Sequence, residues 1–328
     1  MSNPSTDTLG AIVTALRQVT TVCVVGHVRP DGDCVGSQLG LGMALRAAGK
    51  TVSVWNEDAM PRKLMFLDSE DLLSKPRTGE TFDCVVAVDC ASFERLGRVG
   101  SCIGNRRLLI NIDHHASNTR YGDMNWVVAD VPSTGELILE LLKRARWPLT
   151  PAIADCLFTA VSTDTGSFRY ASTRPETFCS AAELVRQGAD LGRIGHRVYD
   201  SHPMSRFRLL RHVYRQARLT HDDRIAYFWL RRGDYGRAGA EREESEGLID
   251  HIRSIEPVVV AVVFEEMDET LVRVSLRSKS DAVDVNKVAQ IFGGGGHKAA
   301  AGARIAGTRL AVQRRVLREL RHAIDRAA

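Results

Sequence analysis

The 328-residue sequence predicts an α/β protein, with a parallel-sheet N-terminal domain followed by a smaller α/β C-terminal domain. Three observations indicate this class. Short apolar, β-branched runs alternate with segments of helical spacing, several of these runs end in Asp or His, and the chain is longer than one hydrophobic core usually supports. Alternating buried strands and helices are typical of a parallel sheet that helices cover.

The expected elements of the first domain follow one another along the chain. Strands are predicted at 21–25, 51–55, 83–88 and 108–112, and helices at 37–48, 132–146, 151–161 and 175–187. Gly49 is expected to end the first helix, and the three later helices each have a proline near the first turn. Residues 162–166, Ser-Thr-Asp-Thr-Gly, are predicted to be an acidic loop.

The second half of the chain begins with a helical, basic segment at about 191–217. Its arginines are spaced to share one helix face, which favours a solvated face of a connecting helix over a site that attracts nucleic acid: Arg208, Arg211, Arg215 and Arg218. Strands are then expected at 225–230, 258–264 and 271–276, and helices at 285–291 and 308–327. The predicted domains are 1–195, a helical linker at 196–218, and 219–328.

Composition narrows the class of protein. A hydrophobic content of 44% and a charged content of 26% are ordinary for a soluble globular protein. The net charge of +4 suits small anionic ligands better than long nucleic acid, which usually requires a heavier basic surface. We expect a cytoplasmic protein without a membrane partner. The seven cysteines form no CxxC pair, and the sequence shows neither a signal peptide nor an apolar run long enough to span a bilayer.

Potential metal ligands follow the predicted strands. The stretch GHVRPDGDCVGS at 26–37 places His27, Asp31 and Asp33 directly after the first strand. The later strands and the acidic loop add Asp89, His114 and Asp164. Because parallel strands present their carboxyl ends at one edge of a sheet, where ligands bind, we expect these side chains to converge.

Four carboxylates and two imidazoles in one pocket must take up protons or bind cations. Two divalent ions with one bridging carboxylate would satisfy them. Oxygen and nitrogen ligands without a thiolate suit Mn²⁺, with cobalt, zinc or iron as alternatives. Two metals about 3.5–4 Å apart activate water for displacement at phosphorus, so the pattern predicts a phosphoesterase.

Each ligand also has a simpler interpretation. Asp33 or Asp89 could cap a helix or turn, the pair His114-His115 could be a polar loop, and Asp164 could be a turn residue. All of these would have to hold independently at the strand ends of one sheet, which favours the metal centre.

These motifs resemble a known family. GHVRPDGDCVGS, VVAVDC, NIDHHASN and STDTGSF resemble, in this order, the four motifs of the DHH phosphoesterase family, and FGGGGHKAAAGA resembles the glycine-rich motif of its DHH-associated domain. The resemblance spans about residues 22–303. Within the family, the two-domain length is most similar to the bifunctional oligoribonuclease and phosphoadenosine-phosphate phosphatase group.

The resemblance implies a role for each site residue. His27, Asp31 and Asp89 would hold one Mn²⁺, and Asp33, Asp89, His114 and Asp164 would hold the other, which makes Asp89 the bridge. His115 would contact the scissile phosphate or protonate the leaving oxygen. Asp113 would orient a neighbouring imidazole.

The second domain is expected to bind the substrate, with the active site in the cleft between the domains. The glycine motif is predicted to present backbone amides to an anion at a helix start, with a flexible glycine turn as the alternative. Its candidate residues are Gly294, Gly295, Gly296, His297 and Lys298. Arg277 resembles the substrate-gripping arginine of this domain, and Arg95 and Ser133 are further candidates.

The implied function is manganese-dependent hydrolysis of very short RNA to nucleoside monophosphates and dephosphorylation of 3'-phosphoadenosine 5'-phosphate, by two-metal activation of water. The alternative is a phosphodiesterase that acts on cyclic dinucleotides or their linear products. A nucleotide-binding regulator is disfavoured because the ligand set is complete, and a dehydrogenase because GxGxxG is missing. Partners would be short RNA and small phosphorylated nucleotides rather than long DNA, and a homodimer is compatible with the family.

Overall fold

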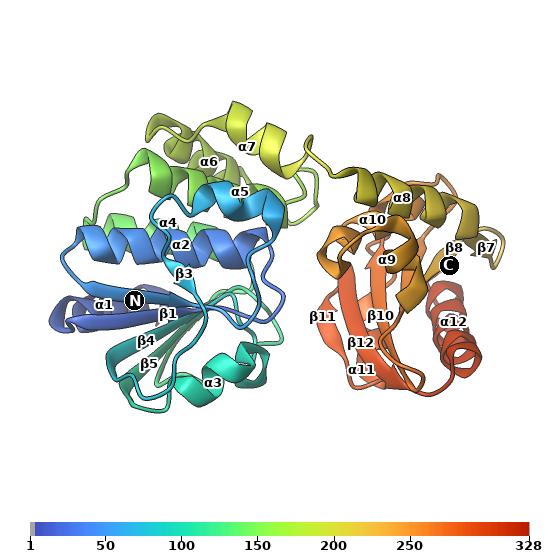
Figure 1. Ribbon diagram of the computed structural model, residues 1–328, viewed down its shortest axis with the longest axis horizontal. Coiled ribbons are helices and arrows are strands. Elements are labelled where there is room, and N and C mark those ends of the chain that lie inside the picture. Colours follow the sequence, from blue (N-terminus) through green and yellow to red (C-terminus); the bar gives the residue numbers. More distant parts are fainter. Residues whose placement is uncertain (1–3, 328) are drawn as a thin grey trace. The chain divides into compact units, whose positions relative to one another are not determined.

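Two units divide the chain in the computed structural model, which describes residues 4–327 (Figure 1). The first unit is Met1–Ser201 and the second is His202–Ala328. The α/β class predicted for both parts is confirmed. Among the described residues, no helix combines the length and the apolar character that crossing a membrane requires.

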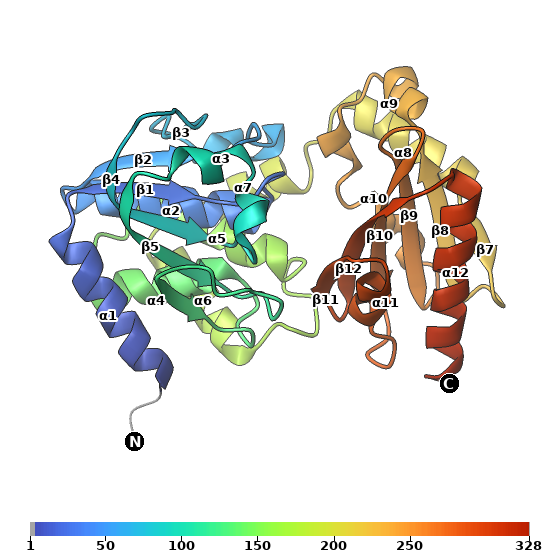
Figure 2. The ribbon, with the colours of Figure 1, turned by 90° about the horizontal axis from the view of Figure 1, so that it is seen from below.

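Six parallel strands form the sheet of the first unit in the order β3-β2-β1-β4-β5-β6 (Figure 1 and Figure 2). Their bounds are β1 Thr21–Val25, β2 Thr51–Trp55, β3 Leu73–Ser74, β4 Phe82–Val88, β5 Arg106–Asp113 and β6 Met124–Val127. Val24 of β1 lies opposite Val54 on one side and Val86 on the other. The strand order therefore reverses between β1 and β4, and such a switch point is where ligands bind in open α/β sheets.

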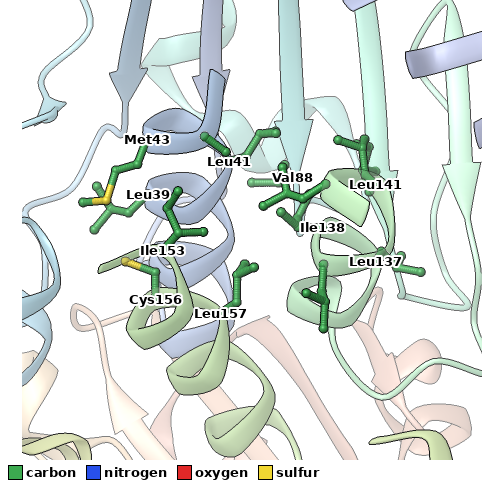
Figure 3. Packing of buried hydrophobic residues seen from close by; sticks show 14 of the residues in the cluster. Leu39, Leu41, Met43, Val88, Leu137, Ile138, Leu141, Ile153, Cys156 and Leu157 are labelled. Carbon is green, nitrogen blue, oxygen red and sulfur yellow. The ribbon is translucent and has the colours of Figure 1, made fainter. Parts of the chain in front are cut away.

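Helices cover both faces of this sheet. Pro4–Gln18 (α1), Gly32–Ala47 (α2), Thr134–Ala145 (α4) and Pro151–Asp164 (α5) share the larger hydrophobic core on one face, with Pro175–Arg186 (α6) and Leu191–Val198 (α7) further out. Figure 3 shows Leu39, Ile138 and Leu157 of three of these helices packed together with Val88. The helix Arg98–Cys102 (α3) and the 3-10 helix Phe93–Leu96 (η2) cover the other face. A further 3-10 helix is η1, Arg62–Leu67.

Glycines on α2 allow close contact with α5. A Cβ atom on Gly36 would lie 2.3 Å from the carbonyl oxygen of Cys156, and one on Gly32 would lie 2.3 Å from Oγ1 of Thr163. A larger residue would therefore push the two helices apart. This contact brings the first turn of α2, which holds Asp33, beside the last residue of α5, Asp164.

The second unit contains a mixed sheet in the order β11-β12-β10-β9-β8-β7, in which only β8 and β9 are parallel among the described pairs. Its strands are β7 Arg218–Thr220, β8 Ile225–Leu230, β9 Val260–Glu266, β10 Leu271–Ser278, β11 Gly295–His297 and β12 Ala300–Ala306. Its helices are α8 Met204–Gln216, α9 Arg232–Ala238, η3 Arg242–Ser245, α10 Leu248–Arg253, α11 Val285–Ile291 and α12 Arg309–Asp325. Helices α11 and α12 share one hydrophobic core with the sheet, and α8, α9 and α10 share another.

Some predicted boundaries change in the structure. Helix α2 begins at Gly32 rather than at residue 37, because Asp31 caps it by accepting a hydrogen bond from the Cys34 amide. The predicted acidic loop at 162–166 is partly helical, since α5 continues to Asp164. Pro132 lies before helix α4 rather than in its first turn, because Ser133 is the N-cap.

One correction also applies to the basic helix in the second half of the chain. Arg218 is not on the basic helix, because α8 ends at Gln216 and Arg218 begins β7. The segment predicted as a linker at 196–218 contains the end of α7 and all of α8, whose buried Leu209 and Val213 belong to a core of the second unit. The strands β3, β6, β7, β11 and β12 are not among the elements predicted from the sequence.

Candidate metal centre and substrate-binding residues

The predicted ligands meet at the carboxyl edge of the first sheet. His27 follows β1, Asp89 follows β4, and His114 follows β5. Two helices add to them, because Asp33 lies in the first turn of α2 and Asp164 is the last residue of α5. The site therefore lies where the strand order reverses.

Asp89 lies between two imidazoles and faces each with a different oxygen. Its Oδ2 is 3.3 Å from Nε2 of His27, and its Oδ1 is 3.4 Å from Nε2 of His114. The residue is buried and has a φ of +52°, a left-handed conformation that is uncommon outside glycine. This conformation turns the carboxylate into the cluster at the point where β4 ends.

Both imidazoles are oriented through their other ring nitrogen. Nδ1 of His27 lies 2.8 Å from the carbonyl oxygen of Val28, and Nδ1 of His114 lies 3.2 Å from that of Val131. A carbonyl oxygen only accepts, so each Nδ1 carries the proton. Each Nε2 is then free of a proton in the neutral ring and can bind a cation.

Asp33 is held by the N-terminus of helix α4. Its carboxylate accepts hydrogen bonds from the amides of Thr134 at 2.7 Å and Gly135 at 2.9 Å, and from the Ser37 hydroxyl at 3.1 Å. A side chain at Gly135 would collide with Ala160, since its Cβ would lie 2.5 Å from that methyl group. The close approach fixes one oxygen of Asp33 3.7 Å from Nε2 of His114.

Asp31 and Asp164 form the accessible side of the cluster. The Asp31 side chain is 45% exposed, and its Oδ1 lies 3.8 Å from Nε2 of His27 while it caps α2. The Asp164 side chain is 32% exposed, and its Oδ2 lies 3.2 Å from Nε2 of His114. The six predicted ligands are therefore together in one cluster, with an imidazole at each end of Asp89.

The protonation equilibria show how crowded the negative charge is. Burial raises the pKa of Asp33 well above its usual value, and the charges of Asp89 and Asp164 add to this. Burial also raises the pKa of Asp164, to about 7, against the opposing charge of His114. For Asp89, burial raises the pKa, but hydrogen bonds from His114 and His27 and the charges of His115 and His27 together hold it well below its usual value. Burial lowers the pKa of His114, but the hydrogen bond to Asp89 and the charges of Asp164 and Asp33 raise it well above normal.

These residues fit divalent cations. The ion pairs described for Asp33, Asp89 and Asp164 are all with imidazoles, so the charge of the cluster is balanced only when those rings hold protons. Ligand atoms lie within 4.8 Å of one another in one group of Asp33, His114 and Asp164 and in another of His27, Cys34 and Asp89. Two adjacent groups, each with imidazole and carboxylate, can hold two ions.

Asp113 and His115 form a pair beside this cluster. Nδ1 of His115 donates to Oδ1 of the buried Asp113 at 2.8 Å, and it lies 3.7 Å from Oδ1 of Asp89. The other oxygen of Asp113 accepts from Nδ2 of Asn118 at 2.6 Å. The carboxylate therefore fixes both the orientation of the His115 ring and the position of its proton.

Several supporting residues were not predicted from the sequence. Gln38 donates to the carbonyl oxygen of Trp55, and Asn56 donates both to the carbonyl oxygen of His27 and to Gln38. The Thr134 hydroxyl donates to Asp89 at 3.2 Å. A buried amide side chain leaves no periodic pattern in the sequence by which it could be predicted. Asn118 and Cys34, however, lie inside the motifs NIDHHASN and GHVRPDGDCVGS.

In the second unit, the glycine motif forms a strand rather than a helix start. It follows the C-terminus of α11, and β11 pairs with β12. A Cβ on Gly294 would lie 2.1 Å from the carbonyl oxygen of Gly302, and Gly296 has a φ of +145° and a similar clash with Ala300 at 2.5 Å. The glycines are therefore required for the close approach of β12, and the prediction that a helix starts here is wrong. Binding of an anion by the backbone amides of this motif stays a prediction.

Strand pairing brings two of the predicted substrate-binding residues into one row. Arg277 of β10 and His297 of β11 both lie directly opposite Ala300 of β12. Side chains of directly opposed residues project from the same face of a sheet, so Arg277 and His297 flank a single methyl group. Gly295 lies in the same strand, and Lys298 follows His297 in the turn to β12.

Arg95 and Ser133 occupy supporting positions in the first unit. The carbonyl oxygen of Arg95, in η2, accepts a hydrogen bond from the Val28 amide at 2.8 Å, next to His27. The Ser133 hydroxyl is buried and caps α4 by accepting from the Glu136 amide. Substrate contacts by these two side chains stay predictions.

Comparison with known proteins finds family models that match both the first and the second part of the chain. The family model described as the DHH family, N-terminal domain, matches residues 21–161, and the model of the DHHA1 domain matches residues 222–328. The bifunctional oligoribonuclease and PAP phosphatase NrnA of Thermus thermophilus is 36% identical over 311 residues, which cover 93% of this chain and 91% of the relative. The protein of the same name from Bacillus subtilis is 27% identical over 299 residues, or 90% of this chain and 92% of the relative.

Solved structures show the same fold. The crystal structure of an exopolyphosphatase-related protein from Bacteroides fragilis is 25% identical, with a TM-score of 0.85 over 97% of this chain and 96% of that one. RecJ of Thermus thermophilus, solved in complex with Mn²⁺, has a TM-score of 0.53 at 16% identity over 99% of this chain and 55% of that one.

Proposed function

This chain belongs to the DHH family and is a metal-dependent phosphoesterase; from that premise we propose that it uses Mn²⁺ to hydrolyse very short RNA and phosphoadenosine phosphate. The products from RNA would be nucleoside monophosphates. The observation that carries this proposal is Asp89, whose two oxygens face the imidazoles of His27 and His114. The names of the relatives support the substrate class.

The cluster divides naturally around Asp89. His27 and Asp31 lie on one side of this carboxylate, and Asp33, His114 and Asp164 lie on the other. We assign the first pair to one ion and the other three residues to the second ion, with Asp89 shared. Oxygen-rich ligands favour Mn²⁺ in both positions. When bound, such ions lower the pKa of water and neutralise charge on phosphoryl oxygens.

The protein's own residues complete the chemistry. The hydrogen bond from Nδ1 of His115 to Asp113 leaves Nε2 as the ring nitrogen that exchanges a proton. We assign His115 to protonation of the leaving oxygen and Asp113 to the positioning of His115. Because Asp113 is buried and also accepts from Asn118, the ring is oriented before substrate binds.

Substrate recognition is assigned to the second unit. Arg277 and His297 offer hydrogen-bond donors from one row of the sheet, and the small Ala300 between them leaves room for a flat group or a phosphate. Glycines 294–296 keep the neighbouring backbone free of side chains. This row suits one terminal phosphate or base rather than a long strand, which needs an extended groove with stacking platforms.

The central test is hydrolysis by the purified chain with Mn²⁺. The substrates are RNAs of two to five nucleotides, phosphoadenosine phosphate, cyclic di-adenylate and pyrophosphate, and the variant is Asp89→Asn. Asp83→Asn is a matched control, because Asp83 lies in the same strand at the opposite end of the sheet. We expect monophosphate release from the RNAs that is lost in Asp89→Asn and kept in Asp83→Asn.

Other outcomes of this assay would replace the proposal. Turnover confined to cyclic di-adenylate would indicate that the substrates are cyclic dinucleotides. Turnover confined to pyrophosphate would indicate that the substrate contains no nucleotide. Binding of nucleotides without turnover of any substrate would indicate a regulator.

A second test concerns recognition. Arg277→Ala should raise KM for short RNA about tenfold or more with a smaller effect on kcat, because a charge-assisted contact worth roughly 1.5–3 kcal/mol is lost. Arg304→Ala is the control, since Arg304 is exposed on β12 four residues beyond Ala300. Equal effects of the two substitutions would show a general charge effect and contradict the assignment.

A further inference from the structure

We propose that Cys34 is a sulfur ligand held ready beside the ion position of His27 and Asp89, so that this position binds thiophilic ions such as Cd²⁺ and Zn²⁺ with a thiolate. The inference rests on the metal centre of the proposed function, but it concerns the identity of the ion rather than the substrate. It also revises the expectation that the ligand set contains only oxygen and nitrogen.

The geometry places the sulfur among the ligand atoms. One ligand atom each from His27, Cys34 and Asp89 lie within 4.8 Å of one another, and all three residues are buried. His27 and Asp89 point at each other across 3.3 Å, which marks this position independently of the cysteine. In a tetrahedral site, Zn–S and Zn–N bonds of about 2.3 and 2.1 Å place the two ligand atoms about 3.6 Å apart, so a shift of at most about 1.2 Å closes the group around an ion.

The surroundings hold the thiol in this place. A Cβ on Gly26 would lie 2.4 Å from Sγ of Cys34, so only glycine leaves room for the sulfur there. The thiol lies 3.5 Å from Oε1 of Gln38, the oxygen that also accepts from Asn56. Asn56 in turn donates to the carbonyl oxygen of His27. The side chains of Gln38 and Asn56 therefore position both the sulfur and the imidazole.

Other cysteines of the chain do not share this arrangement. Cys90 directly follows Asp89 and is also buried, but its thiol donates to the carbonyl oxygen of Ser92 at 3.2 Å. None of the metal-binding groups found among the described residues contains Cys90. The neighbouring cysteine thus offers a matched control of equal burial.

A thiolate ligand would make the His27 position selective for soft metal ions. Mn²⁺ prefers oxygen ligands and leaves the thiol protonated, whereas Cd²⁺ and Zn²⁺ prefer thiolate. On binding such an ion, the S–H bond breaks, the proton passes to solvent and the sulfur electron pair forms the bond to the metal, without any change of oxidation state. These ions should therefore displace Mn²⁺ from the His27 position.

The test is titration of the full chain with Cd²⁺, followed by the near-ultraviolet sulfur-to-cadmium charge-transfer absorption. All proteins carry Cys179→Ala, which removes the exposed thiol. We expect the band in this background and in Cys90→Ala, and its loss in Cys34→Ala and Cys34→Ser. Cys34→Ala should weaken Cd²⁺ binding at least about tenfold and change Mn²⁺ binding much less, because only a soft ligand is lost.

The outcomes separate this inference from the proposed function. Equal absorption and Cd²⁺ affinity with and without Cys34, while Mn²⁺ still binds, would overturn the role of Cys34 and leave the metal centre intact. Failure of the background protein to bind either ion would overturn the metal centre itself. Folding of each variant is checked by circular dichroism, and the serine variant preserves the size of the side chain.

Discussion

Asp113→Asn tests the proposed role of the Asp113–His115 pair, because the surrounding hydrogen bonds dictate how asparagine must sit. One oxygen of Asp113 accepts from His115 and the other from Asn118. The side-chain amide of Asn118 cannot flip without losing hydrogen bonds, since its Nδ2 also donates to Asn111 and its oxygen accepts from the Arg120 amide. The new asparagine must therefore give its oxygen to Asn118 and its NH₂ group to His115.

The substitution should place the His115 proton on the wrong nitrogen. An NH₂ group facing Nδ1 requires that nitrogen to accept, which moves the proton to Nε2. A positioned acid or base contributes about 10²- to 10⁴-fold to the rate, so we expect kcat to fall within this range. This loss corresponds to about 3–5 kcal/mol of activation free energy.

The assay is steady-state hydrolysis of a short RNA, with Mn²⁺ binding measured by calorimetry as the second readout. Mn²⁺ binding should change little, because His115 is not an assigned ligand. Asn118→Ala should partly restore activity to Asp113→Asn, since the asparagine can then turn its oxygen towards His115. The reasoning would be refuted if kcat of Asp113→Asn stayed within about threefold of the unsubstituted protein, because a loss of at least about 10²-fold is expected. It would also be refuted if adding Asn118→Ala restored no activity to Asp113→Asn.

Two further predictions concern the scaffold and the charge of the cluster. Gly36→Ala should lower the free energy of unfolding by about 1–3 kcal/mol in denaturant titrations, because the new Cβ would collide with the Cys156 carbonyl oxygen. The control is Gly10→Ala, whose Cβ meets open space, so the free energy of unfolding should not fall. The pKa of Asp164 is raised to about 7 and that of His114 is raised well above its usual value, so both residues bind a proton more readily in the folded than in the unfolded protein. The metal-free protein should therefore lose stability as the pH rises from about 6 to 8. Mn²⁺ should then raise Tm more at the higher pH, and a larger rise at the lower pH would contradict this.

The residues of the candidate metal centre could be predicted from the sequence because their signal is local. A buried strand is a continuous apolar run, and the residue that follows it in a parallel sheet must lie at the carboxyl edge. His27, Asp89 and His114 each follow such a run, and the structure brings them together. The acidic residues of α2 and α5 were found through their motifs, although the helices extend further than predicted.

The glycine motif shows where such reasoning fails. Consecutive glycines indicate a close backbone approach but do not identify the neighbour, and here β12 lies against them where a helix start was predicted. Cys34 was likewise interpreted only as part of a motif, because nothing in its neighbours along the chain reveals that Gly26 leaves space for its sulfur.

The sequence by itself determined the α/β class, the order of the main elements and the set of candidate ligands, since periodicity and strand ends depend only on residues near in the chain. Tertiary structure alone decided which oxygen of Asp89 faces which imidazole, that the amides of α4 hold Asp33, and that Arg277 and His297 share a row. The physical reason is that burial is encoded in local patterns, whereas hydrogen-bond partners far apart in the chain depend on helix packing and strand register.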